Sequence, residues 1–224
     1  MNWDALRLSV ALALGTVLVL VPLALVVARW LAFHRFAAKP WVEALLATPL
    51  VLPPTVIGYY LLVVFGQQSW LGQWFTSWFG QPLVFSFAGL WVASVLVNVP
   101  FAVQPMQRVF EKLHQDWRDA AACCGMSTWQ AFWRVELPLV WPGVLTAVVL
   151  TFAHTLGEFG VVLMVGGNIP GETKTLAVAI YDEVQAFNFE AAGQMAALLL
   201  VFSVLVLGAV SGWGRRLAVG RGHD

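Results

Sequence analysis

One segment near the middle of the chain combines a carboxylate, small residues and helix-ending residues at fixed spacing. It contains, in order, Asp119, Ala120, Ala121, Gly125, Val135, Leu137 and Pro138. A surface of alanine and glycine lets another backbone approach closely. Charged side chains such as Asp119, Arg118 and Arg134 can fix the orientation of that partner through hydrogen bonds. The pattern predicts protein docking rather than bond-making chemistry.

The same segment, over about residues 107–138, shows apolar residues at helical spacing before Gly125. Ser127 can cap a second helix, and we expect Pro138 to end that helix. Two short helices that meet at Gly125 would form a compact unit that transmits motion as a rigid lever.

A second group of polar residues lies inside hydrophobic stretches. His154 and Glu158 are four residues apart, and therefore share one face of a helix. An ionisable group within a membrane span is costly and indicates a functional site. Glu158 lies about 28 Å along a helix that begins at Leu139, near the outer boundary of a membrane. This position favours a gate or a hydrogen-bonding strut over a proton relay.

Prolines interrupt another hydrophobic stretch near its middle. Pro53 and Pro54 are followed by Thr55 and Gly58. Two adjacent prolines should break a helix here, since each lacks a backbone donor and clashes with the preceding turn. The break is either a packing kink or a place where freed polar groups line a pathway, and the half-helix from Pro54 would offer its N-terminal amides to an anion.

Asn98 lies in a further hydrophobic stretch, close to Pro100, Gln104 and Pro105. Amides inside a membrane commonly bridge neighbouring helices. Bridging is the favoured role of Asn98, and lining the translocation pathway is the alternative.

The composition places all these residues in an integral membrane protein. Hydrophobic residues make up 60% of the 224 residues and charged residues 11%, whereas about a quarter of a soluble domain is charged. Runs of about 20 apolar residues cross a bilayer as helices. We expect one all-α domain over residues 1–224, a polytopic transmembrane helical bundle with five spans, at about 8–28, 42–65, 83–103, 139–165 and 192–212.

The distribution of Lys and Arg predicts the orientation of the bundle. With residues 107–138 in the cytoplasm, ten of the 12 basic residues lie inside and only Arg7 and Lys174 lie outside. The inside set is Arg29, Arg35, Lys39, Arg108, Lys112, Arg118, Arg134, Arg215, Arg216 and Arg221. We therefore expect the N-terminus outside and the C-terminus inside.

Two connecting segments remain. Trp70, Trp74 and Trp78 recur every four residues, which predicts a short helix at the outer surface with its indoles at the headgroup level. Residues 173–185 are mildly amphipathic, and the sequence leaves open whether they form a surface helix or the start of the last span.

The spacing of the central segment resembles that of the permease subunits of ATP-binding-cassette importers. Their loop pattern is EAA, three residues, G, nine residues, I, one residue, LP. Asp119-Ala120-Ala121, Gly125, Val135 and Leu137-Pro138 match it, with Asp119 in place of Glu and Val135 in place of Ile. Residues 52–58 (LPPTVIG) and 157–160 (GEFG) look like those of the molybdate permeases, with sulfate and tungstate permeases as near relatives.

The resemblance implies how such a chain works. The central segment would be a coupling loop that docks into a separate ATPase subunit and converts nucleotide-driven closure into movement of the pathway. Pro53, Pro54, Thr55, Gly58, Asn98, Glu158 and Phe159 are the candidate pathway or gate residues. Two copies of the chain would pair with two ATPase subunits and with a periplasmic or extracellular oxyanion-binding protein, in the cytoplasmic (inner) membrane of a bacterium.

The sequence also bears on other functions. It has no phosphate-binding loop of the G-x-x-x-x-G-K-[ST] type, so ATP and magnesium are expected on the partner ATPase and no cofactor on this chain. Neither catalysis nor nucleic-acid binding is expected. The competing hypotheses are a proton-coupled secondary transporter that uses His154 and Glu158, and a structural scaffold.

Overall fold

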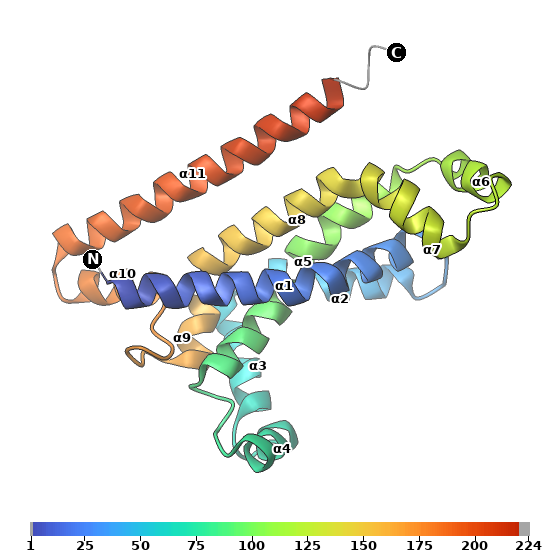
Figure 1. Cartoon of the computed structure of the whole chain (residues 1–224). Helices are drawn as coiled ribbons and strands as arrows, with labels where there is room; N and C mark the ends of the chain where they lie inside the picture. The colour runs from blue at the N-terminus through green and yellow to red at the C-terminus, as the bar shows by residue number, and fades with distance from the viewer. Residues whose placement is uncertain (1, 220–224) are drawn as a thin grey trace.

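The computed structural model describes residues 2–219, and every regular element in that range is helical (Figure 1). The predicted all-α class is confirmed. Of the predicted domain over 1–224, residue 1 and residues 220–224, including Arg221, lie outside the described residues. The helices are α1 (Trp3–Phe33), α2 (Lys39–Val51), α3 (Pro54–Phe65), α4 (Trp70–Phe79), α5 (Phe87–Glu111), α6 (Gln115–Cys123), α7 (Thr128–Ala131), η1 (Phe132–Glu136), α8 (Leu137–Gly157), α9 (Gly160–Gly166), α10 (Leu176–Gln185) and α11 (Phe189–Val219).

Four stretches of helix in the described residues are long and apolar enough to cross a membrane. They are α1, α5, the continuous run Thr128–Gly157 and the part of α11 over Phe189–Val206. The pair α2 and α3 passes the same test only when taken together, and would then be the fifth span. These five units follow the order of the predicted spans.

The predicted interruption at Pro53 and Pro54 is confirmed. Helix α2 ends at Val51, α3 begins at Pro54, and the two axes are bent by 109°. Neither proline can donate a backbone hydrogen bond, so the helical ladder cannot cross the pair. Residues 42–65 therefore form two half-helices that lie nearly at right angles.

Two predicted spans have different limits in the structure. The span at 83–103 was placed too early, because Ser86 caps α5 by accepting from the Gly89 amide at 3.1 Å. Helix α5 then continues to Glu111, since Met106 and Phe110 are buried and extend its apolar face past the last strongly hydrophobic window. The span at 139–165 is not one helix either, because α8 ends at Gly157 and α9 starts separately at Gly160.

The structure also decides the segment that the sequence left open. Residues 176–185 form the separate helix α10, which Thr175 caps and which ends before α11 begins. Leu176, Val178 and Ala179 are buried, and the Leu176 amide donates to Ser9 of α1 at 2.8 Å. Helix α10 is therefore anchored against the N-terminal part of α1. The predicted tryptophan helix is present as α4, with all three indoles exposed.

Helix α1 lies along the centre of the packing. Its buried residues Leu20, Ala24, Ala28 and Leu31 form one core with α5 and α8. Figure 1 shows α11 diverging from this layer on one side, and α3, α4 and α9 leaving it on the other. The N-terminus and α6 lie at opposite ends of α1 (Figure 1), an arrangement in which the two ends of the bundle can face opposite sides of a membrane.

Helices α3 and α9 pack at very short range through glycine. A Cβ atom on Gly160 would lie 2.7 Å from the Cβ of Pro54, and one on Gly58 would lie 2.7 Å from the Cβ of Met164. Contacts this short leave no room for a side chain. The first residues of α3 and α9 therefore lie directly against each other.

Replacing Gly160 with alanine should force α3 and α9 apart. We expect Gly160→Ala to cost about 1–3 kcal/mol, the usual range for overpacking, and to lower the apparent melting temperature in detergent. Gly157→Ala is the matched control, because a Cβ at Gly157 would have no neighbour within 4 Å. Equal melting temperatures for the two variants would contradict the close packing.

Candidate functional site

The first half of the central segment ends in a glycine-dependent helix cap. The Met126 amide donates to the carbonyl of Ala121 at 3.1 Å, and the Gly125 amide to that of Ala122 at 2.9 Å. With Gly125 at φ +74°, these bonds form a Schellman motif. The spacing between Ala121 and Gly125 is therefore the spacing that this cap requires.

The second half differs from the prediction at Pro138. Ser127 caps α7 in a capping box with Gln130, as expected for an N-cap. Pro138 does not end this helix, because α7, η1 and α8 are continuous. The chain widens to a turn of π-helix over Phe132–Glu136, in which the Leu137 amide bonds to the carbonyl of Phe132. This wider turn accommodates a proline that cannot donate within the helix.

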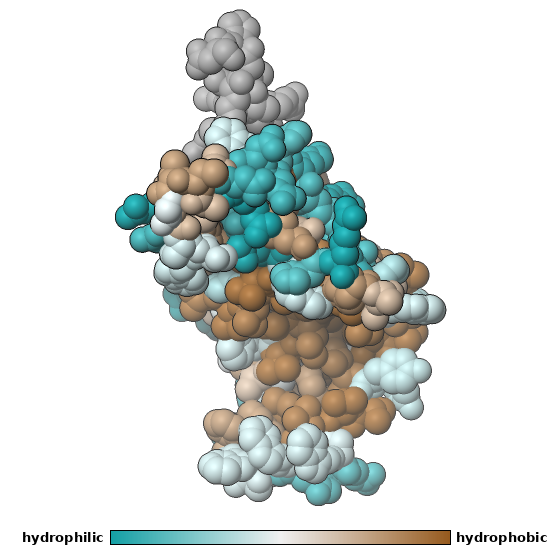
Figure 2. Space-filling model, turned by 90° about the vertical axis from the view of Figure 1, so that its right-hand side faces the viewer, coloured by the Kyte–Doolittle hydropathy of each residue, from teal (hydrophilic) through white to brown (hydrophobic). Residues whose placement is uncertain are grey.

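Most of the residues predicted to dock on a partner lie at the surface. Asp119, Ala120, Gly125 and Pro138 are exposed, and Val135 and Leu137 are partly buried. Ala121 is buried, so it packs α6 within the segment. Figure 2 looks onto the end of the molecule that carries α6 and α7, and shows hydrophilic residues gathered there above a hydrophobic surface.

The structure adds a residue to this segment that the sequence analysis did not single out. Glu136 is 1% exposed and lies between two arginines from distant parts of the chain. Arg29 of α1 donates to both carboxylate oxygens, from Nε at 2.5 Å and from Nη2 at 3.0 Å. Arg118 of α6 forms an ion pair with the same carboxylate at 3.3 Å. We call these three residues the Arg-Glu-Arg joint.

A buried carboxylate of this kind depends on its partners. Removing one member of a buried ion pair typically costs about 3–5 kcal/mol, because a charge is left without compensation. The sequence signal was present, since Glu136 stands alone between apolar Val135 and Leu137 in a helical segment. The family pattern leaves this position variable, which is why it drew no attention.

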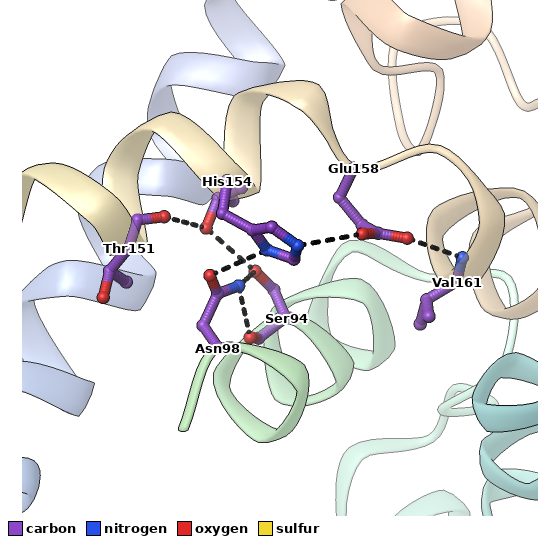
Figure 3. Close-up of polar contacts among 7 residues, drawn as sticks. Ser94, Asn98, Thr151, His154, Glu158 and Val161 are labelled. Atoms are coloured by element: carbon purple, nitrogen blue, oxygen red, sulfur yellow. Dashed lines mark hydrogen bonds and ion pairs between the residues drawn. The ribbon is translucent and has the colours of Figure 1, made fainter. Parts of the chain in front are cut away.

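A polar network crosses the middle of the bundle (Figure 3). Asn98 is fully buried and donates to the carbonyl of Ser94 at 2.8 Å. Its amide oxygen lies 3.1 Å from Nδ1 of His154, a bond that requires a proton on that nitrogen. Thr16 of α1 joins the network by donating to the Ser94 hydroxyl at 3.0 Å. Asn98 thus bridges α5 and α8, which is the role that the sequence favoured.

Glu158 lies at the break between α8 and α9 and holds both helices. Its Oε1 accepts from the Val161 amide at 3.0 Å, as an N-cap side chain does, and its Oε2 lies 3.7 Å from His154 Nε2 (Figure 3). The carboxylate thus satisfies an amide that the start of α9 leaves free. Glu158 thus acts as a hydrogen-bonding strut, because its carboxylate connects the end of α8 to the start of α9.

The other predicted pathway residues fall into two places. Pro53, Pro54 and Thr55 are exposed on one side of the α2–α3 break, and Gly58 is buried against α9. Phe159 is partly buried, with its ring 4.9 Å from that of Tyr181. The contact between Gly160 and Pro54 brings the two helix breaks together. Within residues 2–219, Thr55 forms no hydrogen bond with the polar network.

A groove of about 440 Å³ runs between α2, α5 and α8. Phe101 lines it and stacks on His154 at 4.0 Å, so the groove begins beside the polar network. Gln104 and Arg108 line it further along α5. The sequence placed Arg108 outside the spans, and the longer α5 brings this cation into the groove wall. No cluster of metal-ligating side chains occurs among the residues that the structure describes.

Comparison with known proteins agrees with this architecture. Residues 20–220 match the family described as the inner membrane component of binding-protein-dependent transport systems. The chain belongs to this family. It is therefore an inner membrane component of a transport system, as the coupling-loop spacing and the apolar helices indicate.

Individual relatives cover nearly the whole of this inner membrane component. The molybdenum transport system permease protein ModB of Azotobacter vinelandii is 46% identical, over 92% of this chain and 91% of the relative. The sulfate transport system permease protein CysW of Synechocystis is 36% identical, over 91% of this chain and 74% of the relative. A bacterial alginate ABC transporter, solved in complex with its periplasmic protein, has the same fold, with a TM-score of 0.74 and 13% identity over 96% of this chain and 78% of that one.

The strut geometry of Glu158 leads to a test with two substitutions. Glu158→Ala leaves the Val161 amide without its partner and should cost about 1–3 kcal/mol, whereas Glu158→Gln keeps an acceptor oxygen and should stay close to wild type in thermal stability. We expect Glu158→Gln to retain uptake as well. Loss of uptake by a stable Glu158→Gln protein would indicate proton transfer instead of support.

Proposed function

We propose that this chain is the permease subunit of an ATP-driven molybdate importer. The observation that carries the proposal is the 46% identity to a molybdenum permease across 92% of the chain. Two copies would form the pathway, and each would dock on one ATPase subunit, which would hold ATP and magnesium. A periplasmic oxyanion-binding protein would deliver the anion.

The geometry of the central segment supports docking on a separate ATPase. Helix α6 presents Asp119 and Ala120 to solvent at one end of the molecule, and the Gly125 cap fixes its direction relative to α7. The helical run from α7 into α8 is continuous, so a displacement of the docked loop would reach the membrane without crossing a flexible linker. Asp119 is one methylene shorter than the glutamate of the family pattern, which limits its contact with the ATPase to a shorter reach.

The groove supports passage of an anion with weak binding. Its wall is largely apolar, with Gln104, Thr146 and Arg108 as its polar members. One cation at the end of a mostly apolar path attracts a dianion without holding it in a cage of charges. Selection among oxyanions would then fall to the binding protein.

Reconstitution with the partner proteins tests the proposal. Vesicles that contain the permease and its ATPase should hydrolyse ATP faster, and take up molybdate, when the molybdate-loaded binding protein is added outside. Sulfate and tungstate are tested in parallel, since a sulfate permease is 36% identical to this chain. Stimulation and uptake with sulfate but not molybdate would move the assignment to sulfate.

Gly125 provides a test of the coupling role that separates backbone strain from size. A Cβ at Gly125 would have no neighbour within 4 Å, but φ is +74°. Asparagine tolerates this conformation and valine does not, with a cost on the order of 1–2 kcal/mol for an ordinary residue. We expect Gly125→Val to lose uptake and ATPase association, and Gly125→Asn to keep most of both.

Insertion into the membrane, measured by protein level in the bilayer fraction, should be unchanged in both variants. A Gly125→Val protein with wild-type uptake would remove the coupling role of this loop.

A further inference from the structure

The Arg-Glu-Arg joint connects α1 with two elements of the central segment, α6 and the π-helical turn. Arg29 lies near the end of α1, Arg118 lies on α6, and Glu136 ends the π-helical turn that leads into α8. The carboxylate is 1% exposed, while the side chains of Arg29 and Arg118 are 24% and 36% exposed. Glu136 therefore presents almost no surface to a docking partner, and its ion pairs are internal.

We propose that Glu136 is a positioning residue that makes α6, α1 and α8 move as one unit when the ATPase displaces the coupling loop. The inference rests on the proposed coupling function. Without the joint, α6 would be tied to the membrane helices through the short connection to α5 over residues 112–114, the turn at Gly125 and its packing on α7 and η1. The joint gives α6 an ion pair to Glu136 at the start of α8, and through Glu136 a link to Arg29 of α1.

The two arginines contact the carboxylate with different geometry. Arg29 forms two hydrogen bonds, a geometry that fixes direction as well as distance. Arg118 forms a single longer contact. Both guanidinium groups also lie over the ring of Phe33, Arg118 at 4.2 Å and Arg29 at 5.6 Å from its centroid. The aromatic ring of α1 thus holds both cations beside Glu136.

Helix α1 can carry the displacement further because it has polar attachments along its length. Thr16 donates to Ser94 of the central network, and Ser9 accepts from the Leu176 amide at the start of α10. Arg29 and Ser9 are 20 residues apart, or about 30 Å along a helix. One continuous helix, which contains Pro22 between Arg29 and Thr16, therefore links the central segment, the polar network and α10.

The test breaks the joint from its two sides in the reconstituted complex of permease, ATPase and binding protein. Arg29→Gln removes the contact on α1, and Arg118→Gln removes the contact on α6. Both variants should still copurify with the ATPase and hydrolyse ATP, but the number of anions taken up per ATP should fall roughly fivefold or more, as for loss of coupling between two sites. Arg29→Lys and Arg118→Lys keep the cation and should recover part of that ratio.

Lys112→Gln is the matched control, since Lys112 is an exposed cation near α6 that forms no ion pair within residues 2–219. Its ratio should equal that of wild type. An unchanged number of anions per ATP in both glutamine variants would overturn the inference. A parallel fall in protein level, ATP hydrolysis and uptake, in the glutamine and the lysine variants alike, would also overturn it. Loss of ATPase association in Arg118→Gln alone would make Arg118 a docking residue and would also overturn it.

The wild-type complex separates this inference from the function on which it rests. If the wild-type complex takes up no oxyanion, the proposed function itself fails and the inference fails with it. If the wild type transports and the variants keep its ratio, only the inference fails.

Discussion

Hydrocarbon offers no hydrogen bonds, so each interruption of a helix in this protein has to provide partners for the backbone groups that it frees. At Glu158 the carboxylate caps α9 by accepting from the Val161 amide. At Pro138 the helix widens to a π-helical turn, so that a residue without an amide proton can follow. At Gly125, which is exposed outside the apolar helices, two carbonyls near the end of α6 likewise receive bonds through a left-handed glycine. Each break is therefore accompanied by a local device that bonds the backbone groups it frees.

The same reasoning applies to charge. Glu136 is tolerated in the interior because two arginines and an aromatic ring surround it. These partners come from α1 and α6, so the cost of burying one carboxylate is offset only when three segments are assembled together. A charge that would be unfavourable alone thereby specifies how the central segment sits on α1 and α8. Helix α1, whose sequence looks like a generic apolar span, is in this arrangement the common support of α5, α8 and the loop.

Most features set by local chemistry were predicted from the sequence, and features set by tertiary contacts were not. The exception is Pro138, which was expected to end a helix and instead follows a π-helical turn inside one. Helix class, the break at Pro53 and Pro54, the role of Gly125 and the N-cap at Ser127 all follow from the backbone properties of single residues. The end of α5 was missed because its last turns are polar outside and apolar inside, which lowers their mean hydropathy although Met106 and Phe110 are buried. The break at Glu158 was missed because no proline marks it. The pairing of Glu136 with Arg29 spans 107 residues, and such a pairing has no local signature.

Under the proposed function, the groove explains why pathway residues are hard to identify by charge. A transporter whose path bound the anion tightly would release it slowly, so the path should offer small and dispersed attraction. Arg108 fits this requirement, since it stands among apolar residues and Gln104 in the groove wall. Glu158 has the wrong sign to bind an oxyanion, and its two contacts are already used by the Val161 amide and His154. The ionisable residue that stands out in the sequence therefore caps α9, whereas the cation that lines the groove lies at a helix end that sequence analysis places outside the membrane.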